Sequence, residues 1–251
     1  MDELSNLFLK NSAHRRSSDR AADPEMDLAE MLSKIDPSIE MITLPKPETL
    51  GYQEKGLREG IEKRRTLRRL DPEDRITLEE LSIALWLTQG IVKVDDKRQD
   101  TLRNLPSAGR RHPFETYLGI RNVPGLAPGI YHYIAQEHAL QSSIPGLEAV
   151  DAIAEASFKQ KHMQDAPVIF IWAAHSARTT SRYGSRSLRY IFIDAGHVCQ
   201  NLYLAAELFD GAVCAIGAYD DDAANTVLDL DGNERFVAYM ASLGRKRVSK
   251  A

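Results

Sequence analysis

A long apolar helix in the C-terminal half is the feature of this sequence that most constrains its fold. Between residues 188 and 209, apolar side chains recur at the three- and four-residue spacing of one helical face. Ile193 and Leu204 place apolar groups outside that face, so we expect the helix to be covered on more than one side. It would run for roughly 24 residues, or about 36 Å. Its predicted end is Asp210-Gly211, where glycine can take the left-handed conformation that closes a helix.

Gly196 lies in the middle of this predicted helix, where glycine costs about 1 kcal/mol relative to alanine. Such a glycine is best explained by a second backbone that packs close to it, for example the equivalent helix of a second subunit. A symmetric pair would place the two helices against each other about a two-fold axis. The sequence therefore predicts a homodimer built around this helix.

The other periodic segments alternate between helices and strands without a strict repeat. A capping-box pattern, Thr77-Leu78-Glu79-Glu80, opens a helix that stops at Gln89-Gly90. Residues 92–104 are charged and aperiodic and are expected to form a surface loop. Further helices are expected at 57–65, 147–158 and 221–228, and strands at 114–120, 130–133, 167–172, 213–216 and 236–243. This order favours an α+β fold, with a mixed sheet flanked by helices, over a doubly wound parallel sheet.

Residues 1–55 differ from the remainder in being polar and proline-interrupted, with one short amphipathic helix expected at 27–35. We interpret them as a partly mobile N-terminal arm that lies on a single domain of residues 56–251. The 36 acidic and 32 basic residues give a net charge of −4, which does not support a nucleic-acid surface. No signal peptide or membrane-length apolar run is seen, and Cys199 and Cys214 are expected to be buried thiols, so we expect a cytoplasmic protein.

Two groups of residues could carry chemistry. The arginines at 64, 65, 68 and 69 form either a solvated cationic face or a site for a phosphate group, which guanidinium forks match. Tyr183, between Arg182 and Gly184, is either a partly buried aromatic or a loop residue whose hydroxyl donates a proton. The seven histidines have no metal-ligand spacing, and the sequence contains no Walker loop, Gly-x-Gly-x-x-Gly or Gly-x-Ser-x-Gly motif.

A series of short motifs in a fixed order extends over about residues 57–246. They include Arg64-Arg65-Thr66-Leu67-Arg68, Pro106-Ser107-Ala108-Gly109, His112-Pro113-Phe114-Glu115, Arg182-Tyr183-Gly184, Asp194-Ala195-Gly196-His197, Cys214-Ala215-Ile216-Gly217 and Leu243-Gly244-Arg245. Together they make the sequence similar to the nitroreductase-like family of FMN-dependent oxidoreductases. It most resembles the branch of dehydrogenases that oxidise thiazolines and oxazolines in modified peptides.

The resemblance implies a fold, a cofactor and a set of ligand contacts. The fold would be a mainly antiparallel sheet with a long central helix, in a homodimer whose two FMN sites are shared across the interface. The loop of Pro106, Ser107, Ala108 and Gly109 would contact the flavin bound mainly by the partner subunit. In the other half of the site, Arg64 would meet the phosphate, Thr66 and Arg68 would face the pyrimidine edge, and Arg65 would belong to the same cofactor-binding segment. The backbone of Ile216 and Gly217, with Ala215 before it, would lie against the ring, with the Gly217 amide aimed at N5. Arg245 or Lys246 would add to the phosphate site.

The resemblance also bears on catalysis. Azoline-oxidising members typically carry Lys-Tyr where this chain has Arg182-Tyr183. Because arginine effectively never loses its proton, Arg182 would stabilise negative charge while Tyr183 acts as the acid. The implied activity is hydride transfer through flavin N5, either reducing a nitro or quinone acceptor with NAD(P)H or dehydrogenating a ring in a peptide or metabolite. The alternative from a different class is a flavin-fold scaffold protein without turnover.

Overall fold

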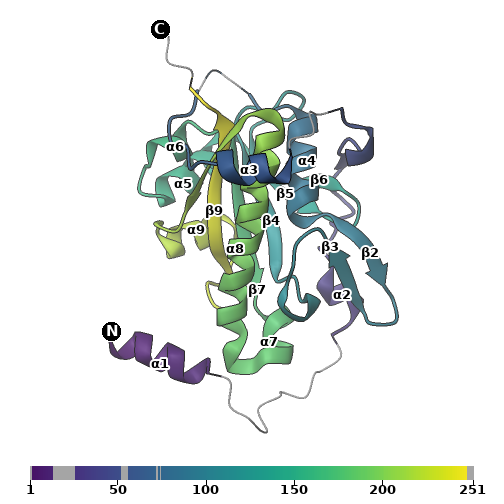
Figure 1. Cartoon of the computed structure of the whole chain (residues 1–251), viewed down its shortest axis with the longest axis vertical. Helices are drawn as coiled ribbons and strands as arrows, with labels where there is room; N and C mark the ends of the chain where they lie inside the picture. Colours follow the sequence, from purple (N-terminus) through teal and green to yellow (C-terminus); the bar gives the residue numbers. More distant parts are fainter. Residues whose placement is uncertain (1, 14–25, 52–55, 72, 74, 248–251) are drawn as a thin grey trace.

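The computed structural model describes residues 2–13, 26–51, 56–71, 73 and 75–247, and its centre is a seven-stranded sheet (Figure 1). Each pair of neighbouring strands is antiparallel, which agrees with the expected α+β class. Across the sheet the order is β1 (Met41–Thr43), β6 (Ala139–Pro145), β5 (Gly129–Ile134), β4 (Phe114–Ile120), β7 (Val168–His175), β9 (Arg235–Arg245) and β8 (Gly211–Ile216).

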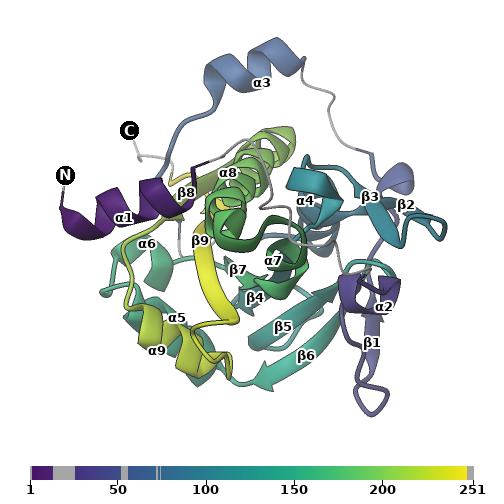
Figure 2. The same ribbon diagram turned by 90° about the horizontal axis from the view of Figure 1, so that it is seen from below.

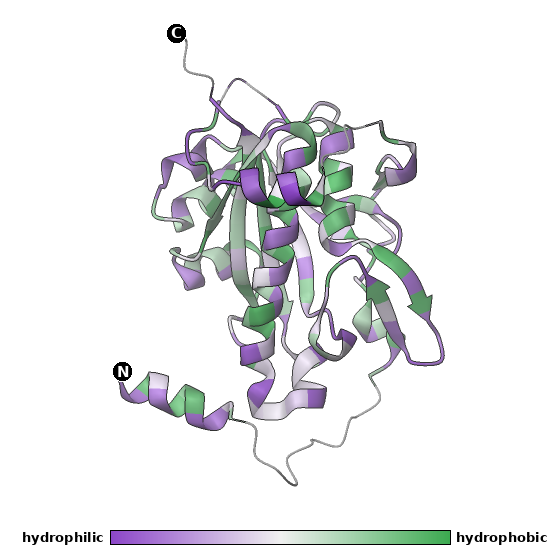
Figure 3. Ribbon diagram, viewed as in Figure 1, coloured by the Kyte–Doolittle hydropathy of each residue, from purple (hydrophilic) through white to green (hydrophobic). Residues whose placement is uncertain are grey.

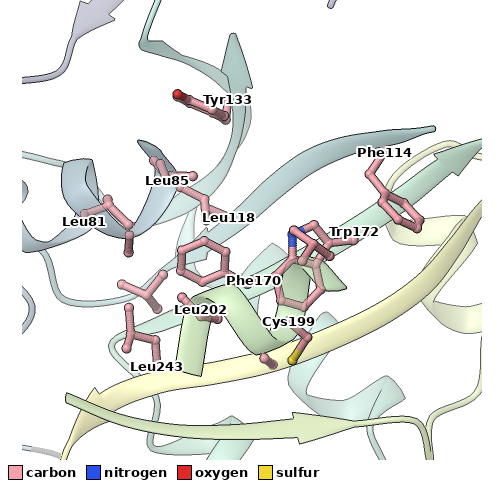
Figure 4. Close-up of a cluster of buried hydrophobic side chains, with 14 of the residues drawn as sticks. Leu81, Leu85, Phe114, Leu118, Tyr133, Phe170, Trp172, Cys199, Leu202 and Leu243 are labelled. Carbon is pink, nitrogen blue, oxygen red and sulfur yellow. The ribbon is translucent and has the colours of Figure 1, made fainter. Parts of the chain in front are cut away.

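The middle strands separate two hydrophobic cores because their side chains alternate between the faces of the sheet. In β7, Phe170 and Trp172 belong to the core on one face, whereas Ile169 and Ile171 belong to the core on the other. Figure 4 shows Phe170 and Trp172 grouped with Leu118 and Cys199 in the first core. The strands are correspondingly hydrophobic in Figure 3. Burial on both faces explains why the sequence of β7 is one continuous apolar run.

Helices cover the two faces unequally. The first face carries α4 (Leu78–Gln89) and the long α8 (Ser187–Ala206), and the other carries α5 (Leu147–Ala156), α6 (Lys161–Gln164) and α9 (Asp221–Val227) (Figure 2). The predicted capping box of α4 is confirmed, since Thr77 accepts from the Glu80 amide and Glu80 accepts from the Thr77 amide. The Asp220 side chain caps α9 by accepting from the Ala223 amide at 3.0 Å.

The long helix is confirmed, with a correction at its end. After α8, a short 3-10 segment η4 (Glu207–Phe209) continues the chain, and Asp210 rather than Gly211 takes the left-handed conformation, with φ 51°. The helix is not covered on every side in a single chain. Phe192 is 50% exposed and Ile193 48% exposed. Gly196 is also exposed, and a Cβ added to it would meet nothing within 4 Å.

The described part of the arm packs on the domain. Helix α2 (Leu28–Met31) is shorter than the predicted 27–35, because the chain becomes extended at Leu32. The side chains of Met31 and Leu44 are buried, and β1 joins the edge of the sheet beside β6. Ahead of the undescribed stretch 14–25, helix α1 (Glu3–Asn11) has no buried residue.

Three local expectations are wrong. Residues 92–104 are not a loop but a hairpin of β2 (Ile91–Asp95) and β3 (Asp100–Arg103), whose apolar side chains Val92 and Leu102 are exposed and so give no core pattern. Strand β6 was not expected, because its second half is only partly buried. Tyr183 lies at the last position of a helix, not in a loop. The remaining elements are η1 (Pro47–Thr49), α3 (Leu57–Lys63), η2 (Ala108–Arg110), α7 (Ala177–Tyr183) and η3 (Gly184–Arg186).

Candidate active site

The first group of predicted site residues lies along β8. The extended segment after α3 runs beside this strand, where Thr66 forms a parallel bridge with Val213 and the Leu67 amide donates to the Val213 carbonyl at 3.0 Å. Tyr203 of α8 joins the two, since its hydroxyl accepts from the Ala215 amide at 2.9 Å and is hydrogen-bonded to Thr66 Oγ1 at 3.1 Å. Segment 64–68, β8 and α8 are therefore fixed to one another by a residue that the sequence did not single out.

Three arginines of this group carry charge that no acid in the described residues offsets. Arg64 is half-buried with its guanidinium over the Tyr203 ring, 5.2 Å from the ring centroid. Arg65 donates only to the backbone carbonyls of Glu62 and Arg64, and Arg68 is exposed. Within the described part of the chain, no carboxylate pairs with any of the three. Such a donor set fits a phosphate group, whose oxygens accept from guanidinium forks.

Arg245 is placed differently from the other predicted phosphate ligands. Its guanidinium donates to the Glu80 carboxylate and to the Phe209 carbonyl, so its charge is already paired within the fold. Lys246, the alternative at this position, is exposed and forms a backbone bridge with Leu70. As the chain stands, Arg245 ties the end of β9 to the start of α4. A contact with phosphate would need this pair to open.

The end of β8, two residues beyond the Ala215 amide that Tyr203 holds, offers open backbone. Ile216 is the last paired residue of the strand and is buried, whereas Gly217 is exposed. A Cβ on Gly217 would meet nothing within 4 Å, so a flat ring could approach the main chain there. The group of Ala215, Ile216 and Gly217 fits the ring of a flavin in this respect.

The second group is the loop of Pro106, Ser107, Ala108 and Gly109, which is held by the buried Asp194 of α8. Ser107 Oγ donates to Asp194 Oδ2 at 2.6 Å, and the Ala108 amide lies 3.3 Å from the same oxygen. Ser107 Oγ in turn accepts from the His112 amide at 2.9 Å. Burial raises the pKa of Asp194, and the two loop hydrogen bonds oppose that rise. A single carboxylate therefore sets the position of the whole loop.

The predicted catalytic pair lies against this loop. Gly109 has a φ of 57°, and an ideal Cβ on it would come within 2.5 Å of the Tyr183 hydroxyl oxygen and 3.1 Å of Arg182 Cδ. The Tyr183 ring packs 4.4 Å from the Tyr190 ring, and the Arg182 guanidinium lies 5.8 Å from the Tyr183 ring centroid. Glycine is needed at position 109 both for its backbone angle and for the space of the tyrosine hydroxyl.

The two groups lie on opposite sides of α8. Asp194, which holds the loop, and Tyr203, which holds segment 64–68, are nine residues apart in the helix. Nine residues make two and a half turns and about 14 Å of rise, so their side chains leave opposite sides of the helix. One chain thus separates the loop and Tyr183 from the arginine cluster and Gly217.

Two other kinds of site find no support in the described residues. No group of three or more histidine, cysteine, aspartate or glutamate side chains there is arranged to hold a metal ion. Among the same residues, no helix is both long enough and apolar enough to span a bilayer.

Comparison with known proteins defines the class. The sequence profile of the nitroreductase family matches residues 61–245, and the chain belongs to that family. It is 33% identical over 171 residues to MJ1384 of Methanocaldococcus jannaschii, a protein named as a nitroreductase, covering 68% of this chain and 82% of that one. It is 30% identical over 131 residues to the trifolitoxin-processing protein TfxB of Rhizobium leguminosarum bv. trifolii, covering 51% of this chain but only 35% of TfxB.

Solved structures share the fold. A structure of the microcin synthetase McbBCD complex of E. coli with truncated pro-MccB17 bound contains a chain of 13% identity and TM-score 0.63, covering 98% of this chain and 92% of that one. A protein of Desulfovibrio desulfuricans, named as a nitroreductase and crystallised in complex with FMN, has 16% identity and a TM-score of 0.52 over 79% of this chain and 93% of its own.

Proposed function

We propose that this chain is an FMN-dependent oxidoreductase that dehydrogenates a ring in a peptide-derived substrate. The observation that carries the proposal is the group of Arg64, Arg65 and Arg68, none of which pairs with a described carboxylate, together with the open backbone of Gly217 at the end of β8. This surface suits an anionic group attached to a flat ring, and FMN is bound by a relative of the same fold. When bound, FMN supplies the acceptance and donation of hydride through N5.

The chain's own residues would bind the cofactor and move a proton. Arg64 and Arg65 would neutralise the phosphate, while Thr66 and Arg68 would hold the pyrimidine edge. Tyr183 would exchange a proton with the substrate, and the fixed positive charge of Arg182 would stabilise negative charge that develops beside it. Arg182 takes no part as a base, because a guanidinium keeps its proton at any pH the fold survives.

The peptide-derived substrate is supported by the relatives. TfxB is named for trifolitoxin processing, and the McbBCD structure contains truncated pro-MccB17. The second candidate is reduction of a nitro or quinone acceptor with NAD(P)H as the electron donor. It is favoured by the name of MJ1384, which this chain matches over most of its length.

We further propose that the active unit is a homodimer with two shared FMN sites. Because the loop with Tyr183 and the arginine cluster with Gly217 lie on opposite sides of α8, one chain would supply only half of each site. The exposed apolar side of the same helix, with Phe192 and Ile193, would face the partner. The site would then combine the arginine cluster of one subunit with the loop and Tyr183 of the other.

Purified protein is expected to be yellow, with the absorbance bands of oxidised flavin and one FMN per chain. Arg64→Ala should release FMN, because it removes the cation held over Tyr203. Arg58→Ala is the matched control, since Arg58 is an exposed arginine of the neighbouring helix α3 that pairs with Glu62. A colourless protein that ignores added FMN would exclude the proposal.

Anaerobic mixing of the flavin-loaded protein with each candidate electron donor distinguishes a dehydrogenase from a reductase. A thiazoline- or oxazoline-containing peptide should bleach the flavin without any nicotinamide, and oxygen should restore its colour. Bleaching by NADH or NADPH, followed by reoxidation with a nitroaromatic or a quinone, would favour the second candidate. A flavin that responds to neither, and only to dithionite, would indicate the scaffold protein.

A further inference from the structure

We propose that the arm segment 28–33 is a working part of the active site, which positions Tyr183 through the buried Arg178. The proposal rests on the function given above, since it concerns the placement of the proposed proton-transfer residue. Arg178 is a positioning residue in this scheme and touches neither substrate nor flavin.

Domain side chains hold the main chain of this segment at four consecutive carbonyl groups. Arg178 Nε donates to the Glu30 carbonyl at 2.9 Å, and Arg178 Nη2 donates to the Leu32 carbonyl at 3.1 Å. Between and after them, the Met31 carbonyl accepts from Arg103 at 3.4 Å and the Ser33 carbonyl accepts from Gln136 at 2.8 Å. The Met31 side chain is fully buried and anchors the segment in this arrangement.

A buried carboxylate completes the contact. Glu115 of β4 pairs with Arg178 and accepts from Ser33 Oγ at 2.6 Å and from His132 Nε2 at 2.7 Å. Burial acts to raise the pKa of Glu115, but Arg178 and His132 together hold it well below its usual value. Glu115 and Arg178 are therefore both charged inside the protein, where each needs all of its hydrogen-bond partners.

Arg178 connects this network to the active site in two ways. It lies in α7, whose last residue is Tyr183, so its anchoring fixes the helix that carries the proposed proton-transfer group. It also lies 3.4 Å from the His112 carbonyl as a donor, at the end of the loop that begins with Ser107. Both sides of the contact between Tyr183 and Gly109 are thus tied to one guanidinium.

The segment lies outside the part of the chain that the family profile matches, whereas the side chains that receive it lie inside. The profile begins at residue 61, and Arg103, Glu115, Gln136 and Arg178 all fall within 61–245. Without segment 28–33, each of these four side chains would lose at least one hydrogen-bond partner. This complementarity is what we expect of an arm that completes a site instead of merely covering a surface.

The test compares two buried residues of the arm. Met31→Ala should loosen the segment at Arg178, whereas Leu44→Ala is the matched control, because Leu44 is equally buried but lies beyond this network. Both should lower Tm. Only Met31→Ala should slow the substrate half-reaction at least tenfold with FMN retained, and Met31→Leu should restore the rate. In a Tyr183→Phe background, Met31→Ala should cause no further loss, because both changes act on the same step.

A second measurement, the NMR signal of Tyr183, requires no turnover, so it tests the proposal even if the wild-type protein is inactive. The ¹³Cζ resonance of Tyr183, assigned by its absence in Tyr183→Phe, should shift in Met31→Ala and in Arg178→Lys but not in Leu44→Ala. Lysine at 178 keeps the charge but cannot reach several acceptors with a planar fork. An unmoved resonance, or losses that add to those of Tyr183→Phe, would overturn the proposal. A failed proposed function would show itself differently, as a wild type without flavin or turnover.

Discussion

At the scale of single residues, the contact between Gly109 and Tyr183 joins two runs of sequence that are each recognisable by themselves. The Pro106–Gly109 run and the Arg182-Tyr183 pair could be selected from the sequence because each is a compact local pattern. Their contact could not be, since it depends on Asp194 holding the loop and on Arg178 holding α7. Tyr203 was similarly hidden, because in the sequence it reads as one more apolar residue of a long helix.

Tyr183→Phe should keep FMN and lose at least tenfold in the rate of the substrate half-reaction, or about 1.4 kcal/mol. The physical reason is the loss of the one hydroxyl that lies against Gly109. Tyr190→Phe is the matched control, because Tyr190 belongs to the same ring pair but its hydroxyl accepts from Arg186. Stopped-flow absorbance of the flavin gives both rates. Normal turnover in a flavin-loaded Tyr183→Phe protein would make Tyr183 an ordinary aromatic.

His112 should make the fold less stable as the pH falls. Burial, and next the charge of Arg103, lower its pKa to about 3 from an ordinary 6.5. The unfolded chain therefore takes up a proton near pH 6.5 that the folded chain refuses until about pH 3. The contribution of neutral His112 to the free energy of unfolding is fully present above pH 6.5. It is lost as the pH falls toward 3, by up to about 1.4 kcal/mol per pH unit.

Urea unfolding of wild type and His112→Asn between pH 7 and pH 5 checks this. Asparagine tolerates the φ of 41° at this position and cannot take up a proton. The variant should show a flatter dependence of the free energy of unfolding on pH. Other histidines with lowered pKa, such as His175, contribute equally to both proteins and cancel in the difference. Parallel curves for the two proteins would contradict the prediction.

At the scale of elements, the sequence was informative where at least one face of an element is buried. The capping box and apolar face of α4 gave its bounds, and the continuous apolar run of β7, which is buried on both faces, predicted a strand at 167–172. The hairpin of β2 and β3 was missed because its apolar side chains are exposed, so burial imposed no pattern on it. In α8 the pattern was right, yet which side stays exposed could be seen only in the structure.

Gly196→Leu should abolish the dimer and release FMN together. A Cβ at position 196 meets nothing within 4 Å in its own chain, and leucine favours helix over glycine by up to about 1 kcal/mol, so the single subunit should be no less stable. Only a second subunit packed against Gly196 would be pushed away. Glu155→Leu is the control, because it adds the same side chain to an exposed position of α5 on the other face of the sheet.

Light scattering and flavin absorbance on the same sample measure both outcomes. A Gly196→Leu dimer that still holds FMN would place the subunit interface elsewhere. A wild-type monomer with one FMN per chain would contradict the shared site altogether.

At the scale of the whole molecule, the sequence predicted which residues belong to the proposed site. It did not predict that α8 separates them into two groups within one chain. Segments 64–68, 106–109 and 215–217 are each short runs, and each contains at least one exposed residue. That α8 separates them follows from the positions of Asp194 and Tyr203 around the helix, which no local pattern reveals. For Arg245 the sequence and the structure differ. Its place in the sequence predicts a phosphate ligand, whereas in the structure its guanidinium pairs with the Glu80 carboxylate.

The position of the arm has a consequence for how the protein is made. Segment 28–33 leaves the ribosome before the side chains that hold it, since Gln136 follows Ser33 by 103 residues and Arg178 follows Glu30 by 148 residues. At roughly 5–20 residues per second, translation alone separates Glu30 from Arg178 by roughly 7–30 s. During that interval the Glu30 and Leu32 carbonyls lack the guanidinium that holds them in the folded chain. Segment 28–33 can thus form its contacts with Arg178 only after residues up to 178 have emerged.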